Sequence, residues 1–170
     1  MSVSITKATK EFPFHVSVGA VLTNDEGLIC VHFYKKDDLP IETEKKSDLW
    51  LLMRESIESG EALETTVLRG LKEEFGAAGE VKAYLGSIKS HFPLRVSKVE
   101  VEKTTLYFHV KMTSLDPESR DKDEVESKSE IKWIAPETLE NIFVEQGKKY
   151  GRSDLDESSI IRNYLKYVRN

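Results

Sequence analysis

Alternating hydrophobic and polar residues near the start of the chain predict a pair of β-strands. Val16, Val18 and Ala20 alternate with polar or small residues, and a second apolar run follows at residues 28–33. The intervening Asn-Asp-Glu-Gly at residues 24–27 is typical of a turn. We therefore expect two strands joined by a tight connection.

The next two segments differ sharply in character. Residues 35–48 are polar and carry charges of both signs, which predicts a surface loop that is long for a compact domain. Residues 50–53 are apolar and predict a short strand.

An apolar residue at every fourth position then predicts an amphipathic helix over residues 61–75. Leu63, Val67, Leu71 and Phe75 form one stripe, and Gly76 suits the C-terminal cap.

The rest of the chain predicts more strands and then more helix. Pro136 is expected to open a helix that extends to about residue 144, since proline is tolerated at an early helical position. Strands on both sides of one central helix predict an α/β or α+β sandwich with a mixed sheet. The other expected elements are strands at residues 81–88, 96–101, 104–112 and 131–134, a charged loop at 114–130 and a C-terminal helix at 155–169.

Composition is consistent with one globular domain over residues 1–170. Of the residues 39% are hydrophobic and 32% are charged. The net charge of -5 argues against binding to extended nucleic acid. No apolar run reaches membrane-spanning length, the N-terminal residues lack the apolar core of a signal peptide, and the lone Cys30 suits a reducing compartment. We expect a cytoplasmic protein without a membrane partner, and the sequence leaves a homodimer open.

Two adjacent acids on the predicted helix, Glu73 and Glu74, are the first candidates for chemistry. Because each helical residue advances by about 100°, these carboxylates lie beside the apolar stripe. They could hold Mg²⁺ or Mn²⁺, which prefer oxygen ligands. Adjacent glutamates on a helix are also commonly just a solvated surface, so the pair alone does not decide between a metal site and a solvated face.

The wider frame of these acids resembles the signature of the Nudix family. That signature reads glycine, five residues, glutamate, seven residues, Arg-Glu, an aliphatic residue, any residue, Glu-Glu, any residue, glycine and an aliphatic residue. In residues 55–77 the matching positions are Glu61, Arg69, Leu71, Glu73, Glu74 and Gly76, with Ala77 as a weaker match. Trp50 before the signature, and the later Ser-Glu-Ile-Lys-Trp sequence at residues 129–133, are also similar to the family.

Two positions depart from the signature in ways that affect the expected site. The family glycine is replaced by Glu55, within a Met-Arg-Glu sequence at the position of the family's usual Pro-Gly-Gly turn. Gly70 stands where the family has a glutamate of its metal cluster. Glu55 could crowd the phosphates or act as a replacement ligand, and Gly70→Glu is expected to supply the missing acid and raise turnover.

The resemblance also implies roles for residues outside the two central acids. Glu61 and Arg69 are expected to support the site as a pair near the start of the helix. Glu124 or Glu126, from the loop before the last strand, is the candidate for a further ligand or a water-activating base. Arg54, Lys89 and His91 are candidates for contacts to substrate. An ordinary alternative, as a solvated or structural side chain, exists for each of Glu124, Glu126, Arg54, Lys89 and His91.

The expected function is hydrolysis of a nucleoside diphosphate linked to another moiety, with Mg²⁺ or Mn²⁺ as cofactor. Water would attack a phosphorus of the pyrophosphate, and the missing acid at Gly70 implies reduced activity. The alternative is a nucleotide-binding module that keeps the fold without turnover. A third class, a structural or interaction protein, stays open.

Overall fold

The computed structural model describes residues 14–41, 43, 47–93, 100–123 and 125–170. Its strands are β1 (Phe14–Thr23), β2 (Ile29–Tyr34), β3 (Leu49–Leu51), β4 (Met53–Ser56), β5 (Ala77–Pro93), β6 (Glu100–Leu115) and β7 (Glu130–Ile134). Its helices are α1 (Leu63–Phe75), α2 (Pro136–Tyr150) and α3 (Ser158–Arg169), with short 3-10 turns η1 (Pro117–Ser119), η2 (Val125–Lys128) and η3 (Ser153–Leu155).

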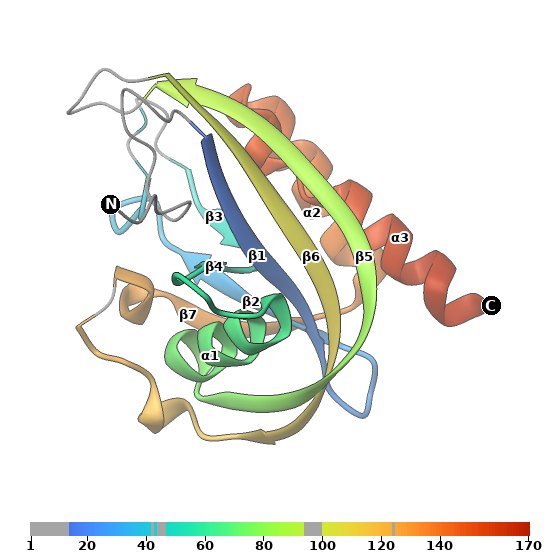
Figure 1. Ribbon diagram of the computed structural model, residues 1–170. Coiled ribbons are helices and arrows are strands. Elements are labelled where there is room, and N and C mark those ends of the chain that lie inside the picture. The colour runs from blue at the N-terminus through green and yellow to red at the C-terminus, as the bar shows by residue number, and fades with distance from the viewer. Residues whose placement is uncertain (1–13, 42, 44–46, 94–99, 124) are drawn as a thin grey trace.

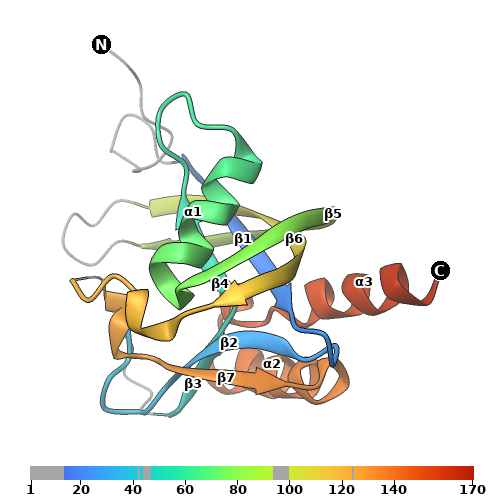
Figure 2. The same ribbon diagram turned by 90° about the horizontal axis from the view of Figure 1, so that it is seen from below.

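Within the described residues, the strands form one seven-stranded mixed sheet. The order is β3-β2-β1-β6-β5, with β4 paired to β1 and β7 paired to β2. β1 and β6 run parallel, and the other pairs are antiparallel. Helix α1 covers one face of the sheet, while α2 and α3 cover the other (Figures 1 and 2). The expected sandwich with a mixed sheet is therefore confirmed.

Strand alternation divides the core between these two faces. Val18 and Ala20 of β1 pack against the stripe of α1, where Val67, Leu71 and Phe75 are all fully buried. The four-residue repeat that predicted this helix is thus the face that packs on the sheet. Gly76 ends the helix with φ of 68°, and its N–H donates to carbonyl oxygens of the last turn.

The opposite face is filled from the C-terminal helices. Phe143 of α2 and Ile160, Ile161 and Tyr164 of α3 pack there with Val21 of β1. The last two helices therefore complete the core.

β1 and β2 separate soon after their common turn, and this opens a wedge in the sheet. Their pairing is limited to Leu22–Cys30 and Thr23–Ile29. Beyond that point β1 pairs with β4, whereas β2 pairs with β3 and β7. Side chains from β2 and β4 and from the C-terminal half of α1 therefore meet beside the wedge.

Several expected boundaries need correction. The strand expected at residues 50–53 is divided between β3 and β4. The Met-Arg-Glu segment, at the position of the family's usual turn, belongs to β4, because residues 53–56 pair with residues 17–20 of β1. The expected strands 96–101 and 104–112 are one strand as far as they are described, since β6 runs from Glu100 to Leu115; residues 96–99 lie outside the described residues. Helix α2 continues six residues beyond the expected end, to Tyr150. Helix α3 begins only at Ser158, after η3.

Candidate active site

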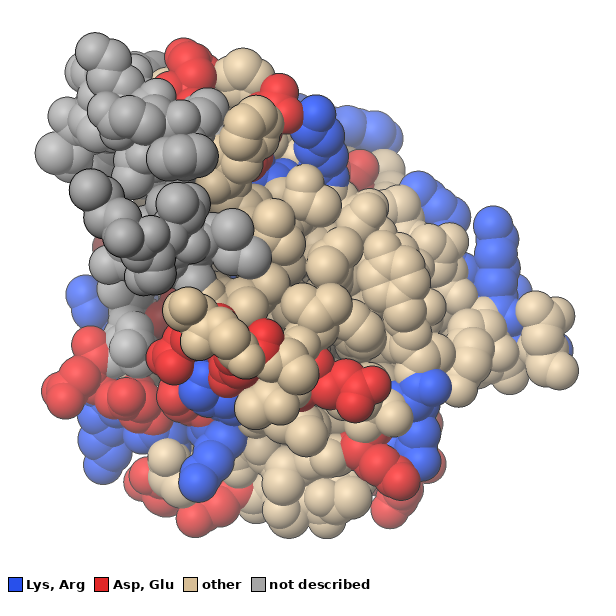
Figure 3. All heavy atoms as spheres, in the orientation of Figure 1, with Lys and Arg blue, Asp and Glu red and all other residues tan. Residues whose placement is uncertain are grey.

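Carboxylates from three parts of the chain line one polar cavity beside α1. The cavity measures about 480 Å³. Its lining residues are Arg54, Glu55, Ser56, Glu58, Arg69, Glu73, Glu74, Lys103, Asp121 and Glu126. Figure 3 shows charged side chains gathered toward the α1 end of the molecule, whereas a broad surface over β5 is largely uncharged. The cavity therefore combines an excess of acids with a few enclosed cations.

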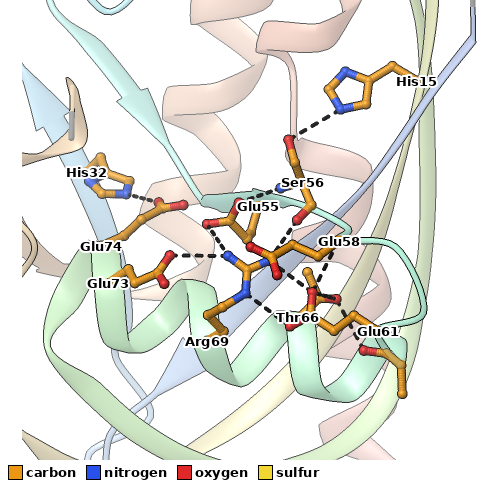
Figure 4. A network of polar contacts seen from close by, with 11 residues as sticks. His15, His32, Glu55, Ser56, Glu58, Glu61, Thr66, Arg69, Glu73 and Glu74 are labelled. Atoms are coloured by element: carbon orange, nitrogen blue, oxygen red, sulfur yellow. Dashed lines mark hydrogen bonds and ion pairs between the residues drawn. The ribbon is translucent and has the colours of Figure 1, made fainter. Parts of the chain in front are cut away.

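Arg69 organises the acids on the α1 side of this cavity (Figure 4). Its guanidinium donates to both carboxylate oxygens of Glu61 at 3.0 Å and to the backbone oxygen of Ser56 at 2.8 Å. It also donates to Oε2 of Glu73 at 3.2 Å, and its Nη1 lies 3.5 Å from Oε2 of Glu55. The hydrogen bond from Arg69 is the main cause that lowers the pKa of Glu61 to about 2. The expected pairing of Glu61 with Arg69 is present in the structure.

Glu74, expected as a metal ligand, is buried with His32 of β2. Oε2 of Glu74 lies 2.6 Å from Nε2 of His32, and Nδ1 of His32 lies 2.6 Å from Oγ of Ser129. Burial raises the pKa of Glu74 well above its usual value, and the charges of Glu126 and Glu55 raise it further.

The hydrogen bonds around Ser129 indicate where the shared proton lies. The Ser129 hydroxyl donates to the backbone oxygen of Glu126 and accepts from Arg120, so its remaining acceptor position is free for Nδ1–H of His32. Burial lowers the pKa of His32 to about 3. A neutral His32 therefore accepts a hydrogen bond from protonated Glu74. As folded, Oε2 of Glu74 is engaged by His32, and a cation would compete with this contact.

The loop before β7 brings Glu126 to the cavity. The guanidinium of Arg120 donates to the backbone oxygens of Glu74, Glu126 and Ser129. The backbone N–H of Asp121 donates to the backbone oxygen of Glu73. These bonds fix the loop against the end of α1, which explains how Glu126 lines the same cavity as Glu73 and Glu74. The alternative candidate, Glu124, lies outside the described residues.

Arg54, a candidate for substrate contact, lines the cavity but has buried protein partners. Its Nε donates to Oε1 of Glu157 at 2.9 Å, and its Nη2 donates to the backbone oxygen of Asp154 at 2.6 Å. Glu157 is fully buried and also accepts hydrogen bonds from the Tyr107 hydroxyl and the Leu52 backbone N–H. The fold thus uses the guanidinium of Arg54 to balance a buried carboxylate.

Lys103 of β6 is a cavity residue that the sequence reasoning missed. Within the part of the chain that the structure describes, its ammonium makes no hydrogen bond or ion pair. Burial, followed by the charge of Arg54, lowers the pKa of Lys103 to about 8. This enclosed cation without a carboxylate partner is available to an anionic ligand.

The structure does not bring Lys89 and His91 to this cavity. Lys89 forms an ion pair with Glu102, and His91 with Glu100, along the exposed part of β5. In the β5–β6 register it is Ser90, between them, that pairs with Lys103. Strand alternation therefore turns Lys89 and His91 to the opposite face of the sheet from Lys103.

The acids of the cavity have the oxygen ligands that suit a hard divalent cation. In the structure, however, their carboxylates do not point to one common position. Glu55, Glu73, Glu74 and Glu126 supply the carboxylate oxygens that Mg²⁺ and Mn²⁺ prefer. Among the described residues, no three acidic, histidine or cysteine side chains stand together as a ready metal site. The reason is that Arg69 holds Glu73 and His32 holds Glu74. Each of these contacts engages Oε2, so a cation has to use the other oxygen of the carboxylate or displace the present partner.

The sandwich and the helix-borne acids together define a Nudix-like domain. The chain belongs to the Nudix family, because the family model described as NUDIX domain matches residues 13–153. Members of this family act on small nucleoside diphosphate derivatives and generally use divalent metal ions. A comparison with curated proteins found no significant match.

Solved structures with the same fold come from several organisms. The ORF135 protein of E. coli is 16% identical with a TM-score of 0.61, and the match covers 95% of this chain and 96% of that one. A MutT protein from Methanosarcina mazei Go1 is 16% identical with a TM-score of 0.56, covering 92% and 94%. A NUDIX hydrolase from Nitrosomonas europaea is 18% identical with a TM-score of 0.62, covering 89% and 88%. At these identities the similarity establishes the fold alone. No helix among the described residues is long and apolar enough to cross a membrane.

Proposed function

We propose that the protein hydrolyses the pyrophosphate bond of a nucleoside diphosphate linked to another moiety, with Mg²⁺ or Mn²⁺ as cofactor. The observation that carries this proposal is one polar cavity lined both by four glutamates, from β4, α1 and the loop before β7, and by the enclosed Lys103. A pyrophosphate is a polyanion and needs cations around it. The protein supplies one cation directly and the oxygen ligands for others.

Each group of side chains has a distinct role in this proposal. Glu73 and Glu126 would hold the cation, together with Glu74 once it leaves His32. The cation would neutralise phosphate oxygens and favour attack of water on phosphorus. Lys103 would bind an anionic oxygen of the substrate, and Arg69 with Glu61 would keep the helix and the end of β4 in place.

A smaller hollow next to the cavity has room for part of the linked moiety. It measures about 160 Å³ and shares Arg54, Glu74, Lys103 and Glu126 with the polar cavity. Its remaining wall is largely apolar and is formed by His32, Tyr34, Pro40, Ile41, Leu51 and Leu52. A substrate with its pyrophosphate near Lys103 would place an uncharged group against this wall.

The alternative is a nucleotide-binding module with little or no turnover. It is favoured by the same contacts that hold Glu73 to Arg69 and Glu74 to His32, since both acids are already paired. Reduced activity is the intermediate case, in which the cation must compete with these partners.

A screen of nucleoside diphosphate derivatives separates these functions. Each compound is incubated with Mg²⁺ or Mn²⁺, and product release and thermal stabilisation are read in parallel. The enzyme is expected to release product from at least one compound, and Glu73→Gln is expected to abolish that release. Glu64→Gln is the matched control, because Glu64 is an exposed acid on the first turn of the same helix. Thermal stabilisation by a compound without any product would establish the binding module instead.

A further inference from the structure

Gly70 is buried where α1 packs against β4, and the space beside it is already filled. A Cβ atom added at position 70 would lie 2.7 Å from Cβ of Glu55, 2.8 Å from Sδ of Met53 and 3.1 Å from Cγ of Glu55. Real Cβ atoms essentially never have neighbours closer than 3.0 Å. A side chain at position 70 and the side chain of Glu55 therefore compete for the same space.

The register of β4 explains why Glu55 points at this space. Met53 pairs with Ala20 and Glu55 with Val18, so both side chains face α1, whereas Arg54 and Ser56 face the other side of the sheet. The Glu55 side chain is only 19% exposed. Its Oε1 accepts a hydrogen bond of 2.7 Å from the Ser56 backbone N–H. Its carboxylate is thereby held in the cavity wall beside Glu73 and Glu74 (Figure 4).

The two departures from the Nudix signature are thus two sides of one contact. The signature has glycine at position 55 and glutamate at position 70, and this chain has glutamate at 55 and glycine at 70. Since the two positions touch, exchanging the residues keeps one carboxylate and one glycine at the junction of β4 with α1. We propose that Glu55 supplies, from the strand, the cation-binding carboxylate that Gly70 no longer supplies from the helix.

A role for Glu55 only as an ion-pair partner of Arg69 accounts poorly for its position beside Gly70. Its distance of 3.5 Å to Arg69 is the longest of the Arg69 contacts with acids, and Glu61 and Glu73 already balance that guanidinium. Glu55 therefore adds a negative charge that the described side chains do not fully compensate. Glycine inside a helix is also unfavourable, so its presence at position 70 needs a reason. Room for the Glu55 side chain is such a reason.

This inference rests on the proposed function, and its first test measures cation binding without any substrate. Mn²⁺ is titrated into the protein in a calorimeter. Glu55→Gln is expected to weaken Mn²⁺ binding roughly tenfold or more, as loss of a coordinating carboxylate would. Glu64→Gln is the matched control, because Glu64 is an exposed acid on the first turn of α1 and does not line the cavity. The control is expected to change the affinity by less than about threefold, since exposed charges are screened.

A second test asks whether positions 55 and 70 exchange roles. Gly70→Glu alone is expected to lower the urea midpoint in chelator, because the new side chain collides with Glu55. The double variant Glu55→Gly with Gly70→Glu is expected to recover that midpoint and to bind Mn²⁺ within about threefold of the parent, a difference of roughly 0.7 kcal/mol. Gly70→Ala should likewise destabilise the parent, and should destabilise the Glu55→Gly variant less, because only the close contact with Sδ of the flexible Met53 side chain then remains.

The outcomes separate this inference from the proposed function. If the parent binds Mn²⁺ and Glu55→Gln binds it equally well, or no worse than Glu64→Gln, the inference is overturned while the proposed function stands. If the parent binds no Mn²⁺, both fail. If Glu55→Gln alone loses Mn²⁺ affinity but the nucleotide screen gives no product, Glu55 is a cation ligand in a binding module.

Discussion

Replacing Glu157 by glutamine should cost a large part of the protein's stability. Glu157 is fully buried, and its two oxygens accept three hydrogen bonds, from Leu52 N–H, Arg54 Nε and the Tyr107 hydroxyl. Glutamine keeps the shape but removes the charge, and its NH₂ group must face at least one of these donors. Removing one partner of a buried ion pair typically costs about 3–5 kcal/mol. With a urea m-value of about 2 kcal/mol per M, a loss of about 4 kcal/mol lowers the urea midpoint by about 2 M.

The assay is urea unfolding followed by far-UV circular dichroism at pH 7, with Glu145→Gln as the control. Glu145 also pairs with a cation, Lys148, at 2.7 Å, but both side chains are about 70% exposed (72% and 68%). Its replacement should change stability by no more than about 0.5 kcal/mol. If Glu157→Gln fails to fold, Tyr107→Phe removes one of the three bonds and should cost about 1–2 kcal/mol. A change below about 1 kcal/mol in a folded Glu157→Gln variant would refute the reasoning.

Two further predictions concern Lys103 and His109. Lys103→Met should weaken binding of inorganic pyrophosphate by about tenfold or more, because a charge-assisted hydrogen bond is worth about 1.5–3 kcal/mol. Lys103→Arg should retain most of the affinity, and Lys82→Met, at an exposed lysine, is the calorimetric control. Equal affinities of the parent and Lys103→Met would remove Lys103 from the site. Burial lowers the pKa of His109 to about 4, below its unfolded value of 6.5. Between these two pH values the imidazole is protonated in the unfolded chain and neutral in the folded protein. The free energy of unfolding should therefore fall as the pH falls from 6.5 to 4. His109→Gln should reduce the dependence of the unfolding free energy on pH by at most about 1.4 kcal/mol per pH unit. Urea titrations at a series of pH values measure this dependence. An unchanged dependence would contradict the lowered pKa of His109.

The parts of the fold that the sequence predicted well are those with an undisturbed period. The stripe from Leu63 to Phe75 identified α1 because every member packs toward the sheet or lies at the start of the helix. β5 was predicted too short, at residues 81–88, whereas the strand runs from Ala77 to Pro93. Before the predicted start, the register shifts between Ala78 and Gly79, which interrupts the alternation that marks a strand. The strand ends at Pro93, a residue type that is disfavoured inside sheets.

β4 was missed for a different reason. Its alternation has no single polar face, since Met53 and Glu55 face α1 while Arg54 and Ser56 face the opposite side. Arg54 is buried against Glu157, which lies 103 residues later in the chain. A local pattern cannot predict that an arginine will be enclosed when its partner comes from another part of the fold.

The candidate site was predictable where its residues fall at positions of the family signature or of its expected neighbours. Glu61, Arg69, Glu73 and Glu74 were found from their spacing, and Arg54, Glu55 and Glu126, also named from the sequence, line the cavity. Lys103 and His32 were not found, because a single lysine or histidine in a strand has no local signal of a cavity. Lys103 is placed by the parallel pairing of β6 with β1, in which it lies opposite His15. Pairing between strands so far apart in sequence becomes visible only in the folded structure.

The same limit explains why positions 55 and 70 looked like two independent defects in the sequence. Read separately, Glu55 adds unwanted charge and Gly70 removes a ligand, and each change predicts a weakened site. The fold brings the two positions within contact distance, so the effect of each depends on the other. Substitutions that share a contact are not additive. Gly70→Glu, which the sequence suggested as a repair, is therefore expected to restore the site only when Glu55 is removed at the same time.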